Sequence, residues 1–196
     1  LEALGWDGFR EARMPGGVVL PPPVVELGLN LVASCPEDGV LLTGDPLETL
    51  AVWYAEFELG RRADLVPIEP SLYATDARYR GQMARALGVD STVAVQRALG
   101  LVAQHRPVCL SPLADAAAMP EWTRTAVRLV LVTGPATPPA DAHLAFTDFL
   151  EAERAGHSVW VPELLRIYQI ASRANPLLCQ SLFAQMGDRT VGACGR

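Results

Sequence analysis

The chain of 196 residues contains no lysine: all 16 of its basic residues are arginine, and its formal net charge is −6. Proteins that follow a nucleic-acid backbone usually carry a stripe or patch of clustered basic residues. The sequence has no lysine-rich cluster of this kind, so we expect no nucleic-acid partner.

Long hydrophobic runs are missing as well. The most apolar early stretch, residues 17–25, is interrupted by three prolines at 21–23, and no run approaches the roughly 20 apolar residues that a membrane helix needs. The sequence begins at Leu1 without a charged segment followed by an apolar one, so we expect a mature or excised piece of a longer protein. Half of the residues are hydrophobic, which suffices for one sizeable core.

Cysteine is scarce, and its four positions, Cys35, Cys109, Cys179 and Cys194, lie far apart. They show none of the CxxC or His-rich spacing of zinc sites, and the glycine fingerprints of nucleotide sites are missing too. We therefore predict neither a metal nor a cofactor. Cys109 lies in an apolar run and is expected to be a small buried residue, whereas Cys194, in a Gly-rich tail, is expected to be exposed. The spacing leaves disulfide pairing open.

Short apolar runs alternate with helical patterns along most of the chain. Strands are predicted at residues 40–43, 64–68, 107–111 and 127–132, and helices at 24–34, 75–87 and 91–105. This alternation predicts an α/β fold with a short, mostly parallel sheet of about four strands flanked by helices. Pro67 cannot donate a ladder hydrogen bond, which predicts either an edge position for the second strand or a shorter strand.

The two ends of the chain differ from this pattern. Residues 1–23, rich in Gly and Pro towards position 23, are predicted to be a connector, which leaves 24–196 as a single α/β domain. Residues 141–155, 161–174 and 176–186 are predicted to be helices, which form a helical annex over 141–186 or cover one face of the sheet.

Residues 43–54, TGDPLETLAVWY, follow the first predicted strand. Asp45 suits a helix N-cap, Pro46 suits the first helical position, and Glu48 stands three residues after Asp45 as in a capping box. The pattern therefore predicts a helix that begins at Pro46. We interpret Glu56 and Glu58, further along this helix, as solvated charges with no assigned role.

A functional interpretation of the same turn starts from its position. Ligands of open α/β sheets gather beyond the carboxyl ends of the strands, where Asp45 and Glu48 are expected. One hypothesis is therefore a small enzyme that uses Asp45 together with the loops at 111–112 and 133–134.

Two tryptophans complete the candidate binding residues, which are Asp45, Glu48, Trp53 and Trp122. Aromatic faces pack on the apolar faces of sugars, but core packing is the better explanation of Trp53 because it borders the apolar stripe of its helix. Trp122, in a loop before the fourth predicted strand, is the better candidate for an exposed aromatic.

A set of residues between positions 44 and 79 also carries a resemblance; its members are Gly44-Asp45, Glu48-Thr49, Trp53-Tyr54, Gly60-Arg61, Asp64, Leu72, Thr75-Asp76 and Tyr79. Their order and spacing resemble the block that follows the membrane spans in a bacterial family of uncharacterised polytopic membrane proteins similar to protein O-mannosyltransferases. Where that family usually has an acidic residue or Asn after Gly-Asp, this chain has Pro46-Leu47, which favours the cap.

The resemblance implies a C-terminal, extracytoplasmic part of a membrane protein, on the periplasmic or cell-surface side and tethered to the membrane. The spanning half would carry out any glycosyl transfer and would be the partner of this chain. The chain itself would then be a non-catalytic accessory domain that recognises a saccharide or an acceptor polypeptide, or that only supports the membrane half.

A third hypothesis is a protein-interaction scaffold built on the C-terminal helices. Its basis is the apolar density of these helices, made up of Leu164, Leu165, Ile167, Ile170, Leu177, Leu178, Leu182 and Phe183.

Overall fold

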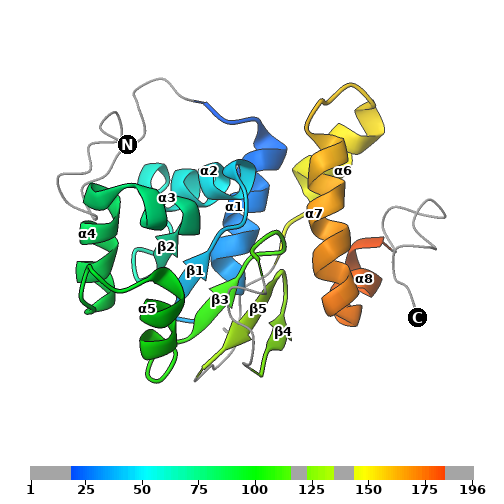
Figure 1. Cartoon of the computed structure of the whole chain (residues 1–196). Coiled ribbons are helices and arrows are strands. Elements are labelled where there is room, and N and C mark those ends of the chain that lie inside the picture. Colours follow the sequence, from blue (N-terminus) through cyan, green and yellow to red (C-terminus); the bar gives the residue numbers. More distant parts are fainter. Residues whose placement is uncertain (1–18, 116–122, 135–143, 184–196) are drawn as a thin grey trace.

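The fold is built on a five-stranded sheet. A computed structural model of the chain describes residues 19–115, 123–134 and 144–183. The strands lie in the order β2-β1-β3-β5-β4, and their bounds are β1 Val40–Leu42, β2 Val66–Ile68, β3 Val108–Leu110, β4 Thr125–Val127 and β5 Val130–Thr133. Strands β2, β1 and β3 are parallel, and β5 and β4 add an antiparallel pair (Figure 1).

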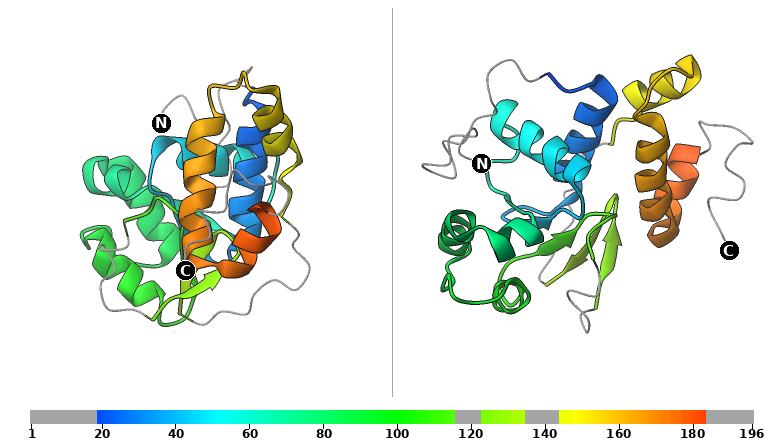
Figure 2. Two further views of the ribbon diagram at one scale, coloured as in Figure 1. Left: turned by 90° about the vertical axis from the view of Figure 1, so that its right-hand side faces the viewer. Right: turned by 45° about the horizontal axis from the view of Figure 1, so that its top comes forward.

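Helices flank the sheet on both sides, which confirms the predicted α/β class. They comprise α1 Pro22–Ser34, α2 Pro46–Trp53, α3 Pro70–Thr75, α4 Ala77–Leu87 and α5 Val95–Val102. Figures 1 and 2 show α1 and α2 on one side of the strands and α4 and α5 on the other. Because both faces are covered, every residue of β1, β2 and β3 is buried.

The edge position predicted for the second strand is confirmed. Among the described strands, β2 pairs with β1 alone, so its other side has no neighbouring strand. On that side no ladder hydrogen bond is lost because Pro67 lacks an N–H group.

The predicted single strand at 127–132 is wrong, because the chain turns back within it. Arg128 and Leu129 join β4 to β5, and Arg128 has φ +52°, a left-handed conformation that tight hairpin turns require. The apolar run carries no Gly, Asn or Pro to mark this turn.

Helix boundaries before β3 differ from the predictions in three places, and the predicted helix 141–155 begins only at Thr147. Pro22 and Pro23 open α1 instead of ending a connector, because a proline in the first turn removes only an amide that has no intrahelical acceptor. The predicted helix 75–87 is preceded by the separate short helix α3, and the predicted helix 91–105 is confined to α5. Residues 1–18 of the predicted connector lie outside the described residues.

Helices α1 and α2, which form the layer on one side of the sheet, pack very closely against each other. A Cβ atom at Gly28 of α1 would lie 2.1 Å from the carbonyl oxygen of Ala51 in α2. Only glycine permits this spacing, so the two helices cross with their backbones almost in contact.

The C-terminal helices α6 Thr147–Ala155, α7 Val161–Ala174 and α8 Pro176–Phe183 form a group beside α1 (Figures 1 and 2). Two polar side chains of α1 hold this group. The Glu26 carboxylate accepts the N–H groups of Asp148 and Phe149 at 2.9 and 3.0 Å, which caps the start of α6. Asn30 accepts the N–H of Ala145 at 2.9 Å, just before that helix.

Most of the apolar side chains proposed for an interaction scaffold are in the core. Leu164, Ile167, Leu178 and Leu182 are buried, Leu165 and Ile170 are half-buried, and Leu177 is exposed. The Phe183 side chain lies outside the described residues. Much of the apolar density of these helices thus serves their own packing, and the scaffold hypothesis stays a prediction. None of the helices in the described ranges has the length and apolar character that crossing a membrane requires.

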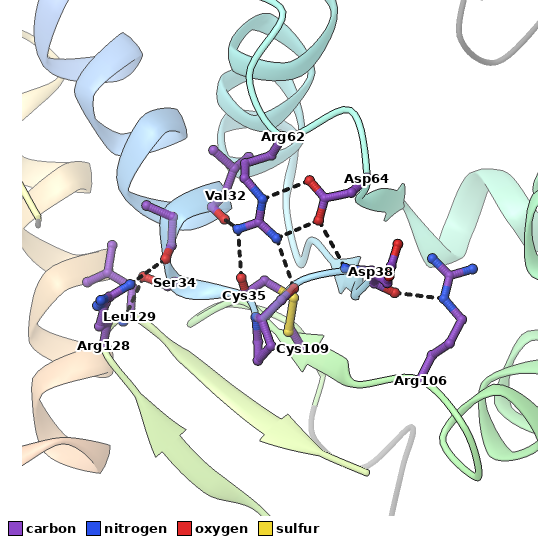
Figure 3. The surroundings of a disulfide bond; sticks show 12 residues. Val32, Ser34, Cys35, Asp38, Arg62, Asp64, Arg106, Cys109, Arg128 and Leu129 are labelled. Atoms are coloured by element: carbon purple, nitrogen blue, oxygen red, sulfur yellow. Dashed lines mark hydrogen bonds and ion pairs between the residues drawn. A yellow bond between two sulfur atoms is a disulfide. The ribbon is translucent and has the colours of Figure 1, made fainter. Parts of the chain in front are cut away.

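A disulfide joins the end of α1 to the middle of the sheet (Figure 3). Cys35 and Cys109 are both fully buried, and their Cα atoms are 5.9 Å apart. Cys109 is therefore buried, as predicted, but it is a bonded residue of β3 and not a free thiol. Cys179 is disulfide-bonded too. Cys194, predicted to be exposed, lies outside the described residues.

Arginines from two distant loops cover the carbonyl end of α1, which has no basic residue in its own last turn. Arg62 donates to the carbonyl oxygens of Val32, Cys35 and Pro36 at 2.8–2.9 Å, and Arg128 donates to that of Ala33 at 2.6 Å. The carboxylate of Asp64 holds the Arg62 guanidinium through two parallel bonds of 2.8 and 2.9 Å (Figure 3).

Candidate functional site

The turn after β1 places Asp45 at the start of α2. Its Oδ1 accepts the backbone N–H of Glu48 at 2.8 Å, and Pro46 occupies the first helical position. The predicted N-cap is therefore confirmed. The Asp45 carboxylate also lies 3.8 Å from the guanidinium of Arg166, whose side chain is 51% exposed, so this ion pair adds little stability.

Glu48 is completely buried and bridges the ends of two strands. Its Oε2 accepts the N–H of Gly44 at 2.9 Å and the hydroxyl of Ser111, and its Oε1 accepts the N–H of Leu113 at 3.1 Å. Gly44 follows β1, whereas Ser111 and Leu113 follow β3. Burial raises the pKa of this carboxyl to about 7, although the three hydrogen bonds act in the opposite direction.

A doubly wound sheet usually binds its ligand between the carboxyl ends of two neighbouring strands whose connections run to opposite sides of the sheet. In this sheet that place is the gap between the carboxyl ends of β1 and β3. Here the Glu48 carboxylate fills that place and takes the amides that a ligand anion would use. A Cβ atom at Gly44 would lie 1.9 Å from the backbone of Leu113, so the two loops touch. This arrangement leaves no room for a substrate between them.

Trp53 is a core residue. It is 7% exposed, and its ring centroid lies 6.4 Å from that of Tyr79 in α4. The Tyr79 hydroxyl in turn accepts the N–H of Glu69 at 2.9 Å. A ring enclosed in this way has no open face for stacking on a sugar. The other aromatic candidate, Trp122, lies outside the described residues.

The loop at 133–134 is not at the edge of the sheet that the enzyme hypothesis requires. Thr133 pairs with Val108, the first residue of β3, because β5 runs antiparallel to β3. A Cβ atom at Gly134 would lie 2.7 Å from the carbonyl oxygen of Ala103, before β3 begins. The antiparallel hairpin therefore carries this loop to the opposite end of the strands from Asp45.

A pocket of about 780 Å³ does open at the carboxyl edge of the sheet, beside the closed gap. Leu42, the last residue of β1, lines it together with parts of α3 and α4, residues 91–96 before and within α5, and residues 114–115 after β3. Its size lies within the range of small-molecule sites. None of Asp45, Glu48 and Trp53 is among its lining residues.

Hydrogen bonds between backbone and side chains stiffen the walls of this pocket. The Tyr73 hydroxyl of α3 donates to the carbonyl of Val93 at 3.3 Å, which joins two walls. Arg80 of α4 donates through Nη1 to the carbonyls of Tyr73 and Ala74 at 3.2 and 2.9 Å. The lining also includes the side chains of Ser71, Ser91, Thr92, Gln96 and Asp115.

Three carboxylates next to pocket-lining residues in the sequence act as helix caps and turn formers. Glu69 accepts the N–H groups of Ser71 and Leu72 at the start of α3. Asp76 accepts the N–H of Tyr79 at the start of α4, and Asp90 accepts that of Thr92. In the described ranges, no cluster of three or more His, Cys, Asp or Glu side chains has the geometry to hold a metal ion.

The sequence interpretation missed α3 and with it one wall of the pocket. The signal was present, because Glu69-Pro70 repeats the cap-then-proline pattern of Asp45-Pro46. Nothing in the sequence marks Arg80 as a pocket residue, since its position depends on how α3 and α4 pack.

Comparisons with known protein families, with curated proteins and with solved structures found no match to this chain. The resemblance carried by residues 44–79 therefore stays a prediction.

Proposed function

We propose that this chain is a non-catalytic accessory domain, located outside the cytoplasm, that binds a saccharide for a membrane-embedded, glycosyltransferase-like half of its parent protein. The observation that carries the proposal is the pocket at the carboxyl edge of the sheet, with its rigid walls and its mixed lining of hydroxyl, amide and apolar groups. Such a lining suits a ligand that presents many hydroxyls on an apolar ring.

A saccharide suits this pocket better than an acceptor polypeptide. A volume of about 780 Å³ holds a few sugar units, whereas an extended chain needs a long groove or a free strand edge. The free edge of β2 offers three residues only, and all three are buried.

Binding without catalysis is supported by the duties of the carboxylates. Glycoside chemistry needs two acidic groups that flank the reacting bond. Glu48, Glu69 and Asp76 instead hold backbone amides, so each serves the fold. The catalytic step would belong to the membrane-embedded half.

The proposed location is supported by the Cys35–Cys109 disulfide, since such bonds persist in oxidising compartments and are rare in the cytosol. Two observations test it. The reading frame of the parent protein should encode hydrophobic spans, and acid-quenched thiol trapping in the native host should leave Cys35 and Cys109 unlabelled. Labelling of both residues would contradict the location.

Saccharide binding is tested by titrating a panel of neutral disaccharides into isotopically labelled protein and following the amide resonances. We expect shifts confined to α3, the start of α4 and residues 91–96. Ala77→Trp should fill the pocket and abolish the shifts, because Ala77 is exposed and lines it.

The matched control is Ala155→Trp, which places the same ring at an exposed position of α6 away from the pocket. If both variants bind like the unaltered protein, or if no disaccharide of the panel shifts any resonance, the saccharide proposal is wrong.

A further inference from the structure

Arg80 gives the pocket a positive charge that is fixed in place. The guanidinium Nη1 is held by the carbonyls of Tyr73 and Ala74. An arginine has five N–H donors in a rigid fork, so this anchoring leaves Nε and Nη2 for another acceptor. Within the described part of the chain, no carboxylate forms an ion pair with Arg80.

A half-buried guanidinium usually pairs with an anion, because leaving its donors without acceptors costs free energy. Arg62 shows the ordinary solution in this protein, where Asp64 accepts hydrogen bonds from the Nε and Nη2 edge of the guanidinium. Like Arg62, Arg80 is held by backbone carbonyl groups. The guanidinium of Arg62 faces a carboxylate, whereas Arg80 lines a cavity.

A second part of the pocket wall favours negative charge as well. Helix α5 begins at Val95 after Ala94, and no side chain caps its first turn. Ala94, Val95 and Gln96 all line the pocket, so the partly positive end of this helix borders the same space as Arg80. The acidic lining residue, Asp115, is exposed.

We infer that the ligand is an acidic saccharide, whose carboxylate is bound by the Nε and Nη2 edge of Arg80 while its hydroxyls meet the rest of the pocket. This inference rests on the proposed saccharide site and adds the charge of the ligand to it. A planar carboxylate matches the geometry of the guanidinium fork through two parallel hydrogen bonds.

The test is a calorimetric titration of the whole chain with a matched pair of probes. Cellobiouronic acid carries one carboxylate, and cellobiose is its neutral counterpart. We expect the acid to bind about tenfold tighter, and this advantage to shrink as NaCl is raised from about 50 to about 500 mM. Inorganic phosphate is the third probe and should bind more weakly than the acid.

The variants separate the two proposals. Arg80→Gln should reduce the affinity for the acid to that for cellobiose, so that the variant no longer prefers the acid. Arg80→Lys keeps the charge but loses the fork, so it should recover only part of the difference. Arg85→Gln removes the same charge from an exposed position of the same helix and should change neither affinity. Circular dichroism and Tm establish that each variant is folded.

Equal binding of the acid and of cellobiose by the unaltered protein would overturn the acidic ligand and leave the saccharide site standing. No binding of either disaccharide would overturn both. Phosphate that binds as tightly as the acid would overturn the acidic saccharide as ligand, because the site would then recognise an anion alone. An unchanged preference for the acid in Arg80→Gln would overturn the role of Arg80.

Discussion

In the turn after β1, two acidic side chains three residues apart have different duties. Asp45 caps α2, whereas Glu48 joins the loop after β1 to the loop after β3. Both belong to the set of residues that carries the family resemblance, and so do Asp64, Asp76 and Tyr79, which also hold backbone groups. At the scale of single residues, this block therefore encodes the way the strand ends are tied together.

Substitution of Asp45 measures the cap alone. Asp45→Ala should lower the free energy of unfolding by roughly 0.5 to 2 kcal/mol, because the N–H of Glu48 loses its acceptor, whereas Asp45→Ser and Asp45→Asn should cost much less. Urea denaturation of the four proteins tests the order. An equal loss for Ala, Ser and Asn would show that the carboxylate acts through its charge.

Glu56 differs most from the sequence interpretation, since the predicted solvated charge is 6% exposed. Burial and, secondly, the nearby charge of Asp64 raise the pKa of Glu56 to about 9. A carboxyl whose pKa is raised on folding stabilises the protein below the unfolded pKa, and this contribution is lost as the pH rises through the folded pKa.

Stability should therefore fall between pH 7 and 9, above the pKa of Glu48, by about 1.4 kcal/mol per pH unit from this group. Glu56→Gln should flatten this part of the profile, and Glu58→Gln, at an exposed position nearby, should leave it unchanged. Urea denaturation at several pH values measures both slopes. A wild-type profile that is flat from pH 7 to 9 would contradict the buried neutral acid.

At the scale of elements, the carbonyl end of α1 depends on residues far away in the sequence. Helix ends commonly carry a nearby glycine or basic residue, but α1 ends at Cys35 in an extended conformation and receives Arg62 and Arg128 from loops. Both arginines have a positive φ, of 56° and 52°. Their backbones therefore adopt a conformation that is costly for a non-glycine residue, and their side chains satisfy the end of α1.

Arg62→Ala should lower the free energy of unfolding by about 2 to 3 kcal/mol, because three carbonyls and Asp64 lose their donor together. Arg62→Lys should recover little of it, since an ammonium cannot reproduce the fork. Arg61→Ala removes the same charge from an exposed neighbour and should stay within about 0.5 kcal/mol of the unaltered protein. Thermal denaturation of the three variants compares them; full recovery by lysine would contradict the fork.

At the scale of the whole molecule, the Cys35–Cys109 disulfide closes a loop with a sequence separation of 74. This loop contains β1, α2, β2, α3, α4 and α5, and therefore every wall of the pocket except residues 114–115. The bond joins the end of α1, where this loop begins, to β3, where it ends.

The double variant Cys35→Ala, Cys109→Ala should lose about 4 kcal/mol of stability, because the unfolded chain regains the entropy of an open loop of this length. For a domain of this size the loss corresponds to a Tm lower by roughly 10 °C. Differential scanning calorimetry of the double variant measures the shift. The variant leaves the disulfide at Cys179 intact, whereas a reducing agent would break both bonds. A Tm that is unchanged would show that the bond adds no stability.

The sequence alone determined those features that depend on neighbours along the chain. The D-P-x-E pattern predicted the cap at Asp45, the apolar runs predicted β1, β2 and β3, and Pro67 predicted the edge. The periodicity of residues 161–174 predicted α7 with its correct bounds. Each of these signals arises within a few residues, because caps, proline and side-chain periodicity act through local backbone geometry.

Only the tertiary structure decided which polar groups are buried and where the pocket lies. The turn of the π-helix at Tyr54–Glu58 is wider than that of an α-helix, so a pattern evaluated at 3.6 residues per turn does not show that Glu56 faces inward. The local sequence indicates only that Glu48 is a polar residue of a capping box. Its burial results from the contact between two loops that are about 65 residues apart in the sequence. The disulfide, the clamp at the end of α1 and the charged wall at Arg80 also join distant segments. The free energy of each of these interactions depends on distances between segments that are far apart in the sequence. Such distances are set only when the layers of the fold pack together, so no local sequence pattern specifies them.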